Sequence, residues 1–338
     1  MAAVATMFAA CSETELVNEM NVPESNSQAI DFSSFSYKTT RGLNSTALDK
    51  YHVAGFGVWA IKGGNTQVMA NYQVVKDGDN WVYDGKGTDQ TLKYWDKALG
   101  YAFYAYAPYV TSTSDVVSFD AGVISVKAGE YAANQNLVGD ALLEKTTANT
   151  EALDAKTFSG VGAESSSAST DWMIASTVTR AAGEVAVVQE VFSHTMSKVI
   201  VILQSTTEGA TMDVTEVAIN NVYGSGSYKS TTGWDVTTQT PKTIKGAEGL
   251  IEGDAETPKQ YYCMEYLVIP SNEAPTFDIV YTLNGTEYER SGLAINTITK
   301  LEPNTIYTIT ATIGQKPISF TTQVSTWSDK GTGGVDIN

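Results

Sequence analysis

The chain has 338 residues, enough for about two domains of ordinary size, and only 17% of its residues are charged. Thr, Ser, Val, Tyr and Gly are abundant, and this composition favours strands and turns over long helices. The formal net charge of −17 makes nucleic acid an unsuitable partner. It also repels anionic lipid surfaces, so attachment to a membrane requires a covalent lipid or a receptor.

The first ten residues are apolar and small, and they are too few to span a bilayer. They lead into Phe8-Ala9-Ala10-Cys11, and small residues before a cysteine suit a lipoprotein signal peptidase. Acidic residues follow and resemble a surface-export signal. We therefore expect residues 1–11 to end a signal that begins upstream, with a lipid on Cys11 and export to the outer-membrane surface. The alternatives are a chance cysteine or a disulfide between Cys11 and Cys263, although the strand-like surroundings of Cys263 favour a buried, inert thiol.

Residues 12–28 are polar and acidic, which predicts a tether. The next stretch has apolar side chains at nearly every second position, which predicts a strand with a bulge where the spacing slips. The residues of this pattern are Ile30, Phe32, Phe35 and Tyr37. The strand runs into a polar, turn-like stretch that contains Arg41-Gly42, so we expect an exposed basic site there.

From Tyr51 onward the chain consists of short apolar runs bounded by turn residues, which is typical of sandwich-like domains. The predicted strands are 52–61, 71–76, 81–83, 101–106, 185–192, 198–203, 213–222, 266–269, 277–283, 305–313 and 318–327. Asn284-Gly285 is a strong hairpin signal. No segment has a long helical repeat, and 128–161 is the most helix-tolerant stretch. The sequence therefore predicts an all-β fold, with one domain over 42–186 and a second over 187–338.

Residues able to support catalysis are scarce. The two histidines, His52 and His194, lie in no metal-binding or triad spacing, and the position of His194 between apolar strands favours a structural role. Asp77, Asp79 and Asp84 lack the closing Glu of an EF-hand, so a hairpin turn is the better interpretation. No glycine-rich loop has phosphate-binding spacing. We expect no enzymatic activity, no metal and no cofactor.

Six tryptophans, Trp327 among them, raise the alternative of a glycan-binding surface, because tryptophan rings stack on sugars. Packing in a core is the favoured interpretation, since these residues lie among predicted strands.

Several stretches resemble, in the right order, the fimbrillin family of Bacteroidetes type V pilus subunits. They are AIDFSSFSYKTTRG (29–42), YWDKALGYAFYAYAP (94–108), TDWMIA (170–175), VFSHTMSKVIVIL (191–203), YLVIPS (266–271) and LEPNTIYTITATI (301–313). Each motif alone is soft, and the specific feature is that together they span nearly all of the chain.

The resemblance implies two transthyretin-like β-sandwich domains and export as a lipoprotein. It also implies cleavage by a trypsin-like protease after an arginine, which releases the first strand and opens a groove. Arg41 is the preferred cleavage site because it follows a strand that can be released without destroying the domain. Arg180 is the rival cleavage site. A plain surface role for Arg41 is the remaining alternative. A strand from the C-terminal region of another subunit then fills the groove. Ile318, Phe320, Thr322 and Val324 share one face of the predicted last strand and are the expected donor residues.

Two function classes remain open. The first is a structural subunit of a surface fimbria, whose partners are other fimbrial subunits and the processing protease. The second is a non-polymerising surface lipoprotein or tip adhesin that binds a glycan or a host protein.

Overall fold

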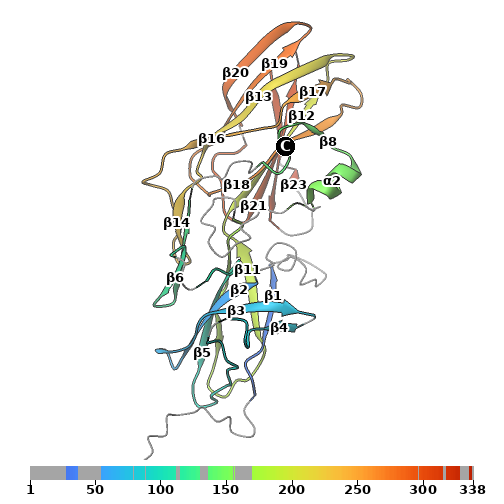
Figure 1. The fold of residues 1–338 in the computed structure, drawn as a ribbon. Coiled ribbons are helices and arrows are strands. Elements are labelled where there is room, and N and C mark those ends of the chain that lie inside the picture. Colours follow the sequence, from blue (N-terminus) through green and yellow to red (C-terminus); the bar gives the residue numbers. More distant parts are fainter. Residues whose placement is uncertain are drawn as a thin grey trace, which may run out of the picture.

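The computed structural model describes residues 28–36, 55–78, 80–87, 89–111, 115–129, 136–154, 156, 170–295, 297–314, 317–327 and 335–336. Within these residues the chain is almost entirely β-structure, so the predicted all-β fold is confirmed. Figure 1 shows an elongated molecule with one group of strands in its lower half and a second group in its upper half.

The lower group is a single sheet that closes on itself. Its strands are β1 (Phe32–Ser36), β2 (Phe56–Lys62), β3 (Thr66–Asp77), β4 (Asn80–Val82), β5 (Tyr101–Ala107), β9 (Met173–Ala175), β10 (Val178–Arg180) and β11 (Val188–His194). They follow the order β10-β5-β2-β3-β4-β1-β11-β9, and β9 also pairs with β5. The strands from β5 round to β9 therefore form a ring, which is filled by apolar side chains such as Phe56, Phe103 and Phe192.

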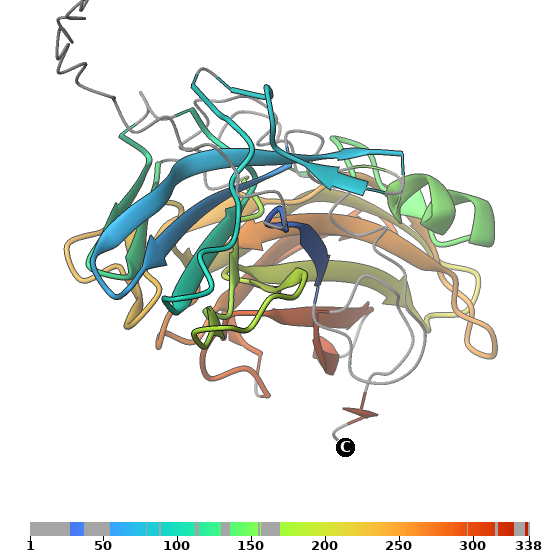
Figure 2. The same cartoon turned by 90° about the horizontal axis from the view of Figure 1, so that it is seen from below.

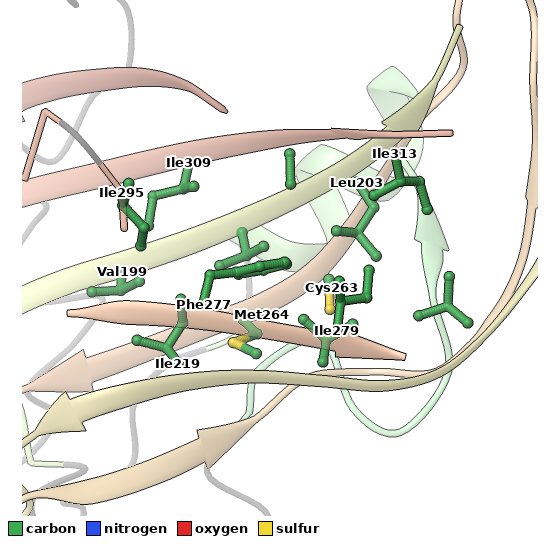
Figure 3. Packing of buried hydrophobic residues seen from close by; sticks show 14 of the residues in the cluster. Val199, Leu203, Ile219, Cys263, Met264, Phe277, Ile279, Ile295, Ile309 and Ile313 are labelled. Atoms are coloured by element: carbon green, nitrogen blue, oxygen red, sulfur yellow. The ribbon is translucent and has the colours of Figure 1, made fainter. Parts of the chain in front are cut away.

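The upper group is a sandwich of two sheets. One contains β8 (Leu143–Glu144), β12 (Ser197–Ser205), β18 (Gln260–Val268), β21 (Thr305–Ile313), β22 (Ser319–Thr326) and β23 (Val335–Asp336), in the order β23-β22-β21-β12-β18-β8. The other contains β13 (Thr211–Val222), β16 (Lys242–Lys245), β17 (Gly249–Glu252), β19 (Thr276–Leu283) and β20 (Thr286–Ala294). Figure 3 shows how Val199 and Leu203 of the first sheet pack with Phe277 and Ile279 of the second.

A small third sheet stands between the two groups. It contains β6 (Val117–Asp120), β7 (Val123–Ala128), β14 (Gly226–Lys229) and β15 (Gly233–Asp235), in the order β15-β14-β7-β6. Its apolar side chains, Ile124 and Val126 among them, pack against Trp59 and Tyr106 on the outer face of the ring. Both faces of β2 and β5 are buried for this reason, which explains their nearly continuous apolar sequences.

The described residues contain one helix, α2 (Thr147–Asp154), which falls within the stretch predicted to be helix-tolerant. The hydroxyl of Thr146 accepts a hydrogen bond from the backbone N–H of Asn149 and so caps its first turn. The helix lies at one side of the molecule, as Figure 2 shows from below, and it buries Leu153 against Ile202 and Tyr262. No helix in the described part of the chain is long and apolar enough to cross a membrane.

Two turns predicted from the sequence are present in the structure. β19 and β20 pair from Leu283 opposite Thr286, so Asn284 and Gly285 form a two-residue turn with φ values of 52° and 77°. Asp77 lies opposite Asn80 in the β3–β4 hairpin. This pairing confirms the hairpin interpretation of the aspartate-rich stretch.

The sheets do not separate at residue 186, where the sequence places a domain boundary. β8 precedes that residue but pairs with β18, and β7 pairs with β14. The division into domains over 42–186 and 187–338 stays a prediction, since shared sheets join the two parts.

Candidate functional site

β1 is the strand that closes the ring. It runs parallel to β11 over five paired positions, from Phe32 opposite Val188 to Ser36 opposite Phe192. On its other side it meets β4, where Phe32 lies opposite Trp81. The strand thus lies between two neighbours, and its removal would leave the backbone edge of β11 unpaired.

The residues before β1 extend its attachment. The N–H of Ile30 donates to the carbonyl of Lys93 at 2.8 Å, and the N–H of Val188 donates to the carbonyl of Asp31 at 2.8 Å. The hydroxyl of Tyr83 donates to the carbonyl of Ile30 at 3.0 Å. Burial raises the pKa of Tyr83 to about 12, so this hydroxyl keeps its proton and remains a donor at neutral pH.

Two apolar residues of the predicted strand, Ile30 and Phe32, help to fill the ring. Ile30 is fully buried, and Phe32 is 5% exposed and meets Phe56, Tyr83 and Phe103 edge-on at centroid distances of 5.7–6.0 Å. Each such side chain contributes about 1.5–3 kcal/mol through burial. The strand therefore supplies both backbone pairing and core.

Cys11, Tyr37 and Arg41-Gly42 lie outside the described residues, and of Phe35 only its backbone place in β1 is described. Lipidation at Cys11 and cleavage after Arg41 thus stay predictions.

Glu190 of β11 is a feature that the sequence interpretation missed. It lies opposite Ser34 of β1 in the parallel register and is fully buried on the same face as Val188 and Phe192. Within the described part of the chain neither carboxyl oxygen has a hydrogen-bond partner. Burial raises its pKa to about 8, while the guanidinium of Arg180 acts in the opposite direction. The strict alternation Val-x-Glu-x-Phe was the signal that placed it in the core.

β22 is the predicted donor strand, and it lies next to the end of its sheet. It pairs with β21 over eight positions, from Thr305 opposite Thr326 to Thr312 opposite Ser319. Among the described residues its other neighbour is β23, which pairs at two positions, Gln323 with Asp336 and Val324 with Val335. Within this part of the chain, few backbone hydrogen bonds hold the outer edge of β22.

The predicted period of two in β22 is confirmed. Ile318, Phe320 and Val324 are partly buried against the upper core, and Thr322 on the same face is 6% exposed. The Phe320 ring meets Phe277 edge-on at 5.3 Å. In this structure the candidate donor face is thus occupied by the molecule's own sandwich.

Trp327, directly after β22, is clamped at the junction of the upper and lower groups. Its ring stacks on His194 at 3.9 Å with an interplanar angle of 5°, and the amine of Lys198 lies 5.8 Å from its centroid. The Nδ1 atom of His194 is 2.8 Å from Oδ1 of Asp171. His194 belongs to β11, so a single strand contacts both β1 and the end of β22.

This clamp gives His194 the structural role expected from the sequence. Among the tryptophans, Trp59, Trp95, Trp172 and Trp327 are buried, which confirms core packing for these four. Cys263 is a free, fully buried thiol whose pKa is raised by burial, as predicted for an inert cysteine.

Arg180, the rival cleavage site, is held by hydrogen bonds within the ring. Arg180 ends β10, and its side chain is 17% exposed. Its guanidinium donates to the carbonyls of Thr179 and Val187 at 3.0 and 2.9 Å. A protease would have to open this part of the ring to reach it.

The described residues contain no group of three or more His, Cys, Asp or Glu side chains that could hold a metal ion.

A family model described as fimbrillin-like matches residues 51–327. Among solved structures, a fimbrial protein from Bacteroides vulgatus is 15% identical, with a TM-score of 0.59 and coverage of 90% of this chain and 100% of the other. A proposed cell adhesion protein from Bacteroides uniformis is 18% identical, with a TM-score of 0.51 and the same coverage. No curated protein matches the chain. At these identities the structural likeness establishes a shared fold.

Proposed function

We propose that this chain, which belongs to the fimbrillin-like family, is a structural subunit of a surface fimbria that assembles by exchange of a strand between subunits. Family membership supports the broader statement, a fimbrial or cell-adhesion subunit with other fimbrial subunits as partners. We propose that the subunits join in two steps. Cleavage after Arg41 releases β1, and β22 of another subunit takes its place.

The observation that carries this proposal is the position of β1. An N-terminal strand next to a candidate cleavage site closes the ring between β4 and β11. Its loss would expose an apolar groove lined by Phe56 and Phe103, together with the unpaired edge of β11. A free edge of this kind is a template for another strand.

β22, the candidate donor strand, has the features needed to fill the groove that β1 would leave. β22 carries one apolar face and is held on one side by the short β23. In the groove, each fully buried large side chain would contribute about 1.5–3 kcal/mol and each backbone hydrogen bond about 1 kcal/mol net. Before cleavage the intramolecular β1 competes at a high effective concentration, so the uncut subunit stays monomeric.

The test is to incubate the purified chain with a trypsin-like protease and follow its size on denaturing and native gels. Wild type should be cut and should form denaturant-resistant oligomers, whereas Arg41→Ala should remain monomeric. A matched variant, Arg290→Ala, removes an arginine from exposed β20 and should behave as wild type. A chain that ends before Ile318 should be cut without assembling. Assembly of that truncated chain would exclude β22 as the donor.

Anchoring is a separate part of the proposal. We expect Cys11 to carry the lipid that holds the precursor at the outer membrane, since each buried CH₂ contributes about 0.8 kcal/mol and two or three acyl chains give firm attachment. Expression with a complete export signal and labelling with a fatty-acid analogue should mark wild type and not Cys11→Ala. Equal labelling of both would exclude this residue.

A further inference from the structure

A cavity of about 1100 Å³ lies at the junction of the upper and lower groups, and strand exchange makes no use of it. It is bounded by the residues after β9, the end of β11, the β14–β15 hairpin and the segment before β21. Figure 1 shows β14 at this level, between the two groups of strands. The volume slightly exceeds the range of about 300–1000 Å³ typical of small-molecule sites, so the cavity has room for a ligand of several rings.

The β14–β15 hairpin contributes two aromatic rings to this cavity. Trp234 is partly exposed, and its Nε1–H donates to the carbonyl of Thr195 at 2.7 Å, which fixes the orientation of the indole. The ring of Tyr228 lies 5.4 Å from it at an interplanar angle of 59°. An aromatic surface held in this way loses little conformational entropy when a ligand packs on it.

Short hydroxyl side chains line much of the remaining wall. Ser176 and Thr177 stand on one side, and Thr231 and Thr232 stand on the hairpin; all four are exposed. Each hydroxyl both donates and accepts hydrogen bonds. A wall of this kind suits a ligand that itself carries many hydroxyl groups, because donors and acceptors can be matched in pairs.

Asp235 provides a charged acceptor at the same rim. Its Oδ1 accepts from the backbone N–H and the hydroxyl of Thr237 at 3.0 and 2.7 Å, and these bonds lower the pKa of the carboxyl. The group is therefore ionised at neutral pH, with Oδ2 available for hydroxyl donors of a ligand.

The charges of the lining exclude anionic ligands. Lys300 is 2.6 Å from Glu302, so its charge is compensated, and Asp235 leaves the wall negative. The chain as a whole carries a formal net charge of −17, which makes the potential around the cavity more negative. Nucleotides, sulfated sugars and sialylated sugars would be repelled.

We propose that this cavity binds a neutral oligosaccharide. Trp234 packs against the apolar C–H face of one sugar ring, while Asp235 and the surrounding serine and threonine hydroxyls bind the sugar hydroxyls. Binding uses the uncut chain and does not depend on the exchange of β22.

The test is a printed array of neutral, sialylated and sulfated oligosaccharides, probed with the purified uncut chain. Calorimetry with the strongest neutral binder follows. Trp234→Ala and Asp235→Asn should each weaken binding by about tenfold or more, as expected when an aromatic anchor or a charged acceptor is removed. Asp213→Asn removes an exposed carboxylate on β13, which is not part of the cavity wall, and should leave binding unchanged.

Unfolding temperatures of all variants separate loss of the site from loss of the fold. Should Trp234→Ala fail to fold, Asp235→Asn and Thr177→Val still test the wall without removing a ring. Absence of binding to any neutral oligosaccharide at concentrations up to about 1 mM would overturn the proposal. So would binding that neither wall variant changes, or binding of unglycosylated peptides that is lost with the same substitutions, because the cavity would then serve a protein partner.

Discussion

At the scale of single residues, Glu190 is a buried acid that lies next to β1 in the ring. With its pKa raised to about 8 this carboxyl is mostly protonated at pH 7, whereas the ordinary pKa of a glutamate in water is 4.5. Its neighbour across the ladder is Ser34 of β1. Loss of β1 would admit water to this part of the core, and ionisation of Glu190 would then favour the open groove.

The sign of the resulting pH dependence follows from proton binding. Between about pH 4.5 and pH 8 the folded chain holds a proton on Glu190 that the unfolded chain has lost, so this group's contribution to stability falls as pH rises through that window. Glu190→Gln removes this dependence. We expect the wild-type free energy of unfolding to fall, relative to the variant, by on the order of 1 kcal/mol per pH unit between pH 5 and pH 8.

Urea unfolding of both proteins at several pH values measures that difference. Glu287→Gln, on the exposed strand β20, is the matched control and should follow wild type. A constant difference between wild type and Glu190→Gln across the window would show that Glu190 is ionised in the folded chain.

Predictions for single residues were confirmed where apolar and polar side chains alternate along the local sequence. Ile30 and Phe32 were placed in a strand because apolar residues recur at nearly every second position, and the structure buries both. The neighbours of Trp327 had no such signal. His194, which stacks on it, and Asp171, which bonds that histidine, lie more than a hundred residues away in the chain, so the sequence marked an aromatic residue without its partners.

At the scale of elements, the clamp around Trp327 holds the end of β22 in place. The ring is 7% exposed, stacks on His194, and has its backbone N–H bonded to the carbonyl of Asn304 at 2.8 Å. If β22 leaves its sheet during assembly, this contact must break. β11 carries His194 at one end and pairs with β1 along its length, so release of β1 would loosen the clamp.

A double-mutant cycle tests this connection. Trp327→Ala should lower the free energy of unfolding by about 3–5 kcal/mol, as for other buried large aromatic residues. His194→Ala and the double variant should reveal a coupling of about 0.5–1.5 kcal/mol between the stacked rings. After protease treatment, Trp327→Ala should also assemble faster than wild type, since β22 is released more easily. Trp327→Phe keeps a ring and should lie between the two.

Chemical denaturation gives the coupling, and the time course of oligomer formation gives the rate. Slower or unchanged assembly of a destabilised Trp327→Ala protein would mean that departure of β22 does not limit the reaction.

Many strands and the hairpin with local signals were predicted, but the pairing of strands that are distant in the chain was not. The β19–β20 hairpin follows from Asn284-Gly285 alone. The parallel pairing of β1 with β11 joins residues that lie far apart in the chain, and no local pattern specifies it. β14 and β15 were missed because their Ser-, Thr- and Gly-rich sequence has few apolar positions, although Trp234 anchors them.

At the scale of the whole molecule, the arrangement places the two candidate exchange strands in different sheets. β1 completes the ring in the lower half, and β22 lies near the edge of the upper sandwich. A strand donated by one molecule would therefore join the upper part of that molecule to the lower part of the next, which extends a polymer along the long axis seen in Figure 1. The sequence predicted the all-β class, but β7–β14 and β8–β18 pairs across residue 186 depend on tertiary contacts that composition does not reveal.

The central claim, that β22 of one subunit occupies the place of β1 in another, is tested most directly by site-specific disulfide formation. The side chain of Gln189 is exposed on β11, so Gln189→Cys places a thiol on the outer side of that strand. The partner thiol is placed on β22 at one of three positions, by Thr321→Cys, Gln323→Cys or Ser325→Cys. Thr321 and Gln323 are on the exposed face of β22. Neighbouring strands bring facing Cα atoms to about 4.5–5.5 Å, which suits a disulfide.

The measurement mixes a Gln189→Cys subunit with each β22 variant, cuts both with the protease, and analyses the products on non-reducing gels. Every variant also carries Cys11→Ser, because the uncut chain would otherwise keep that thiol, and Cys263 is buried, so the introduced thiols report the contact. Our account predicts a cross-linked pair of different subunits for at least one β22 position after cleavage, and none in the uncut mixture. Oligomers that form normally but cross-link at none of the three positions would contradict it.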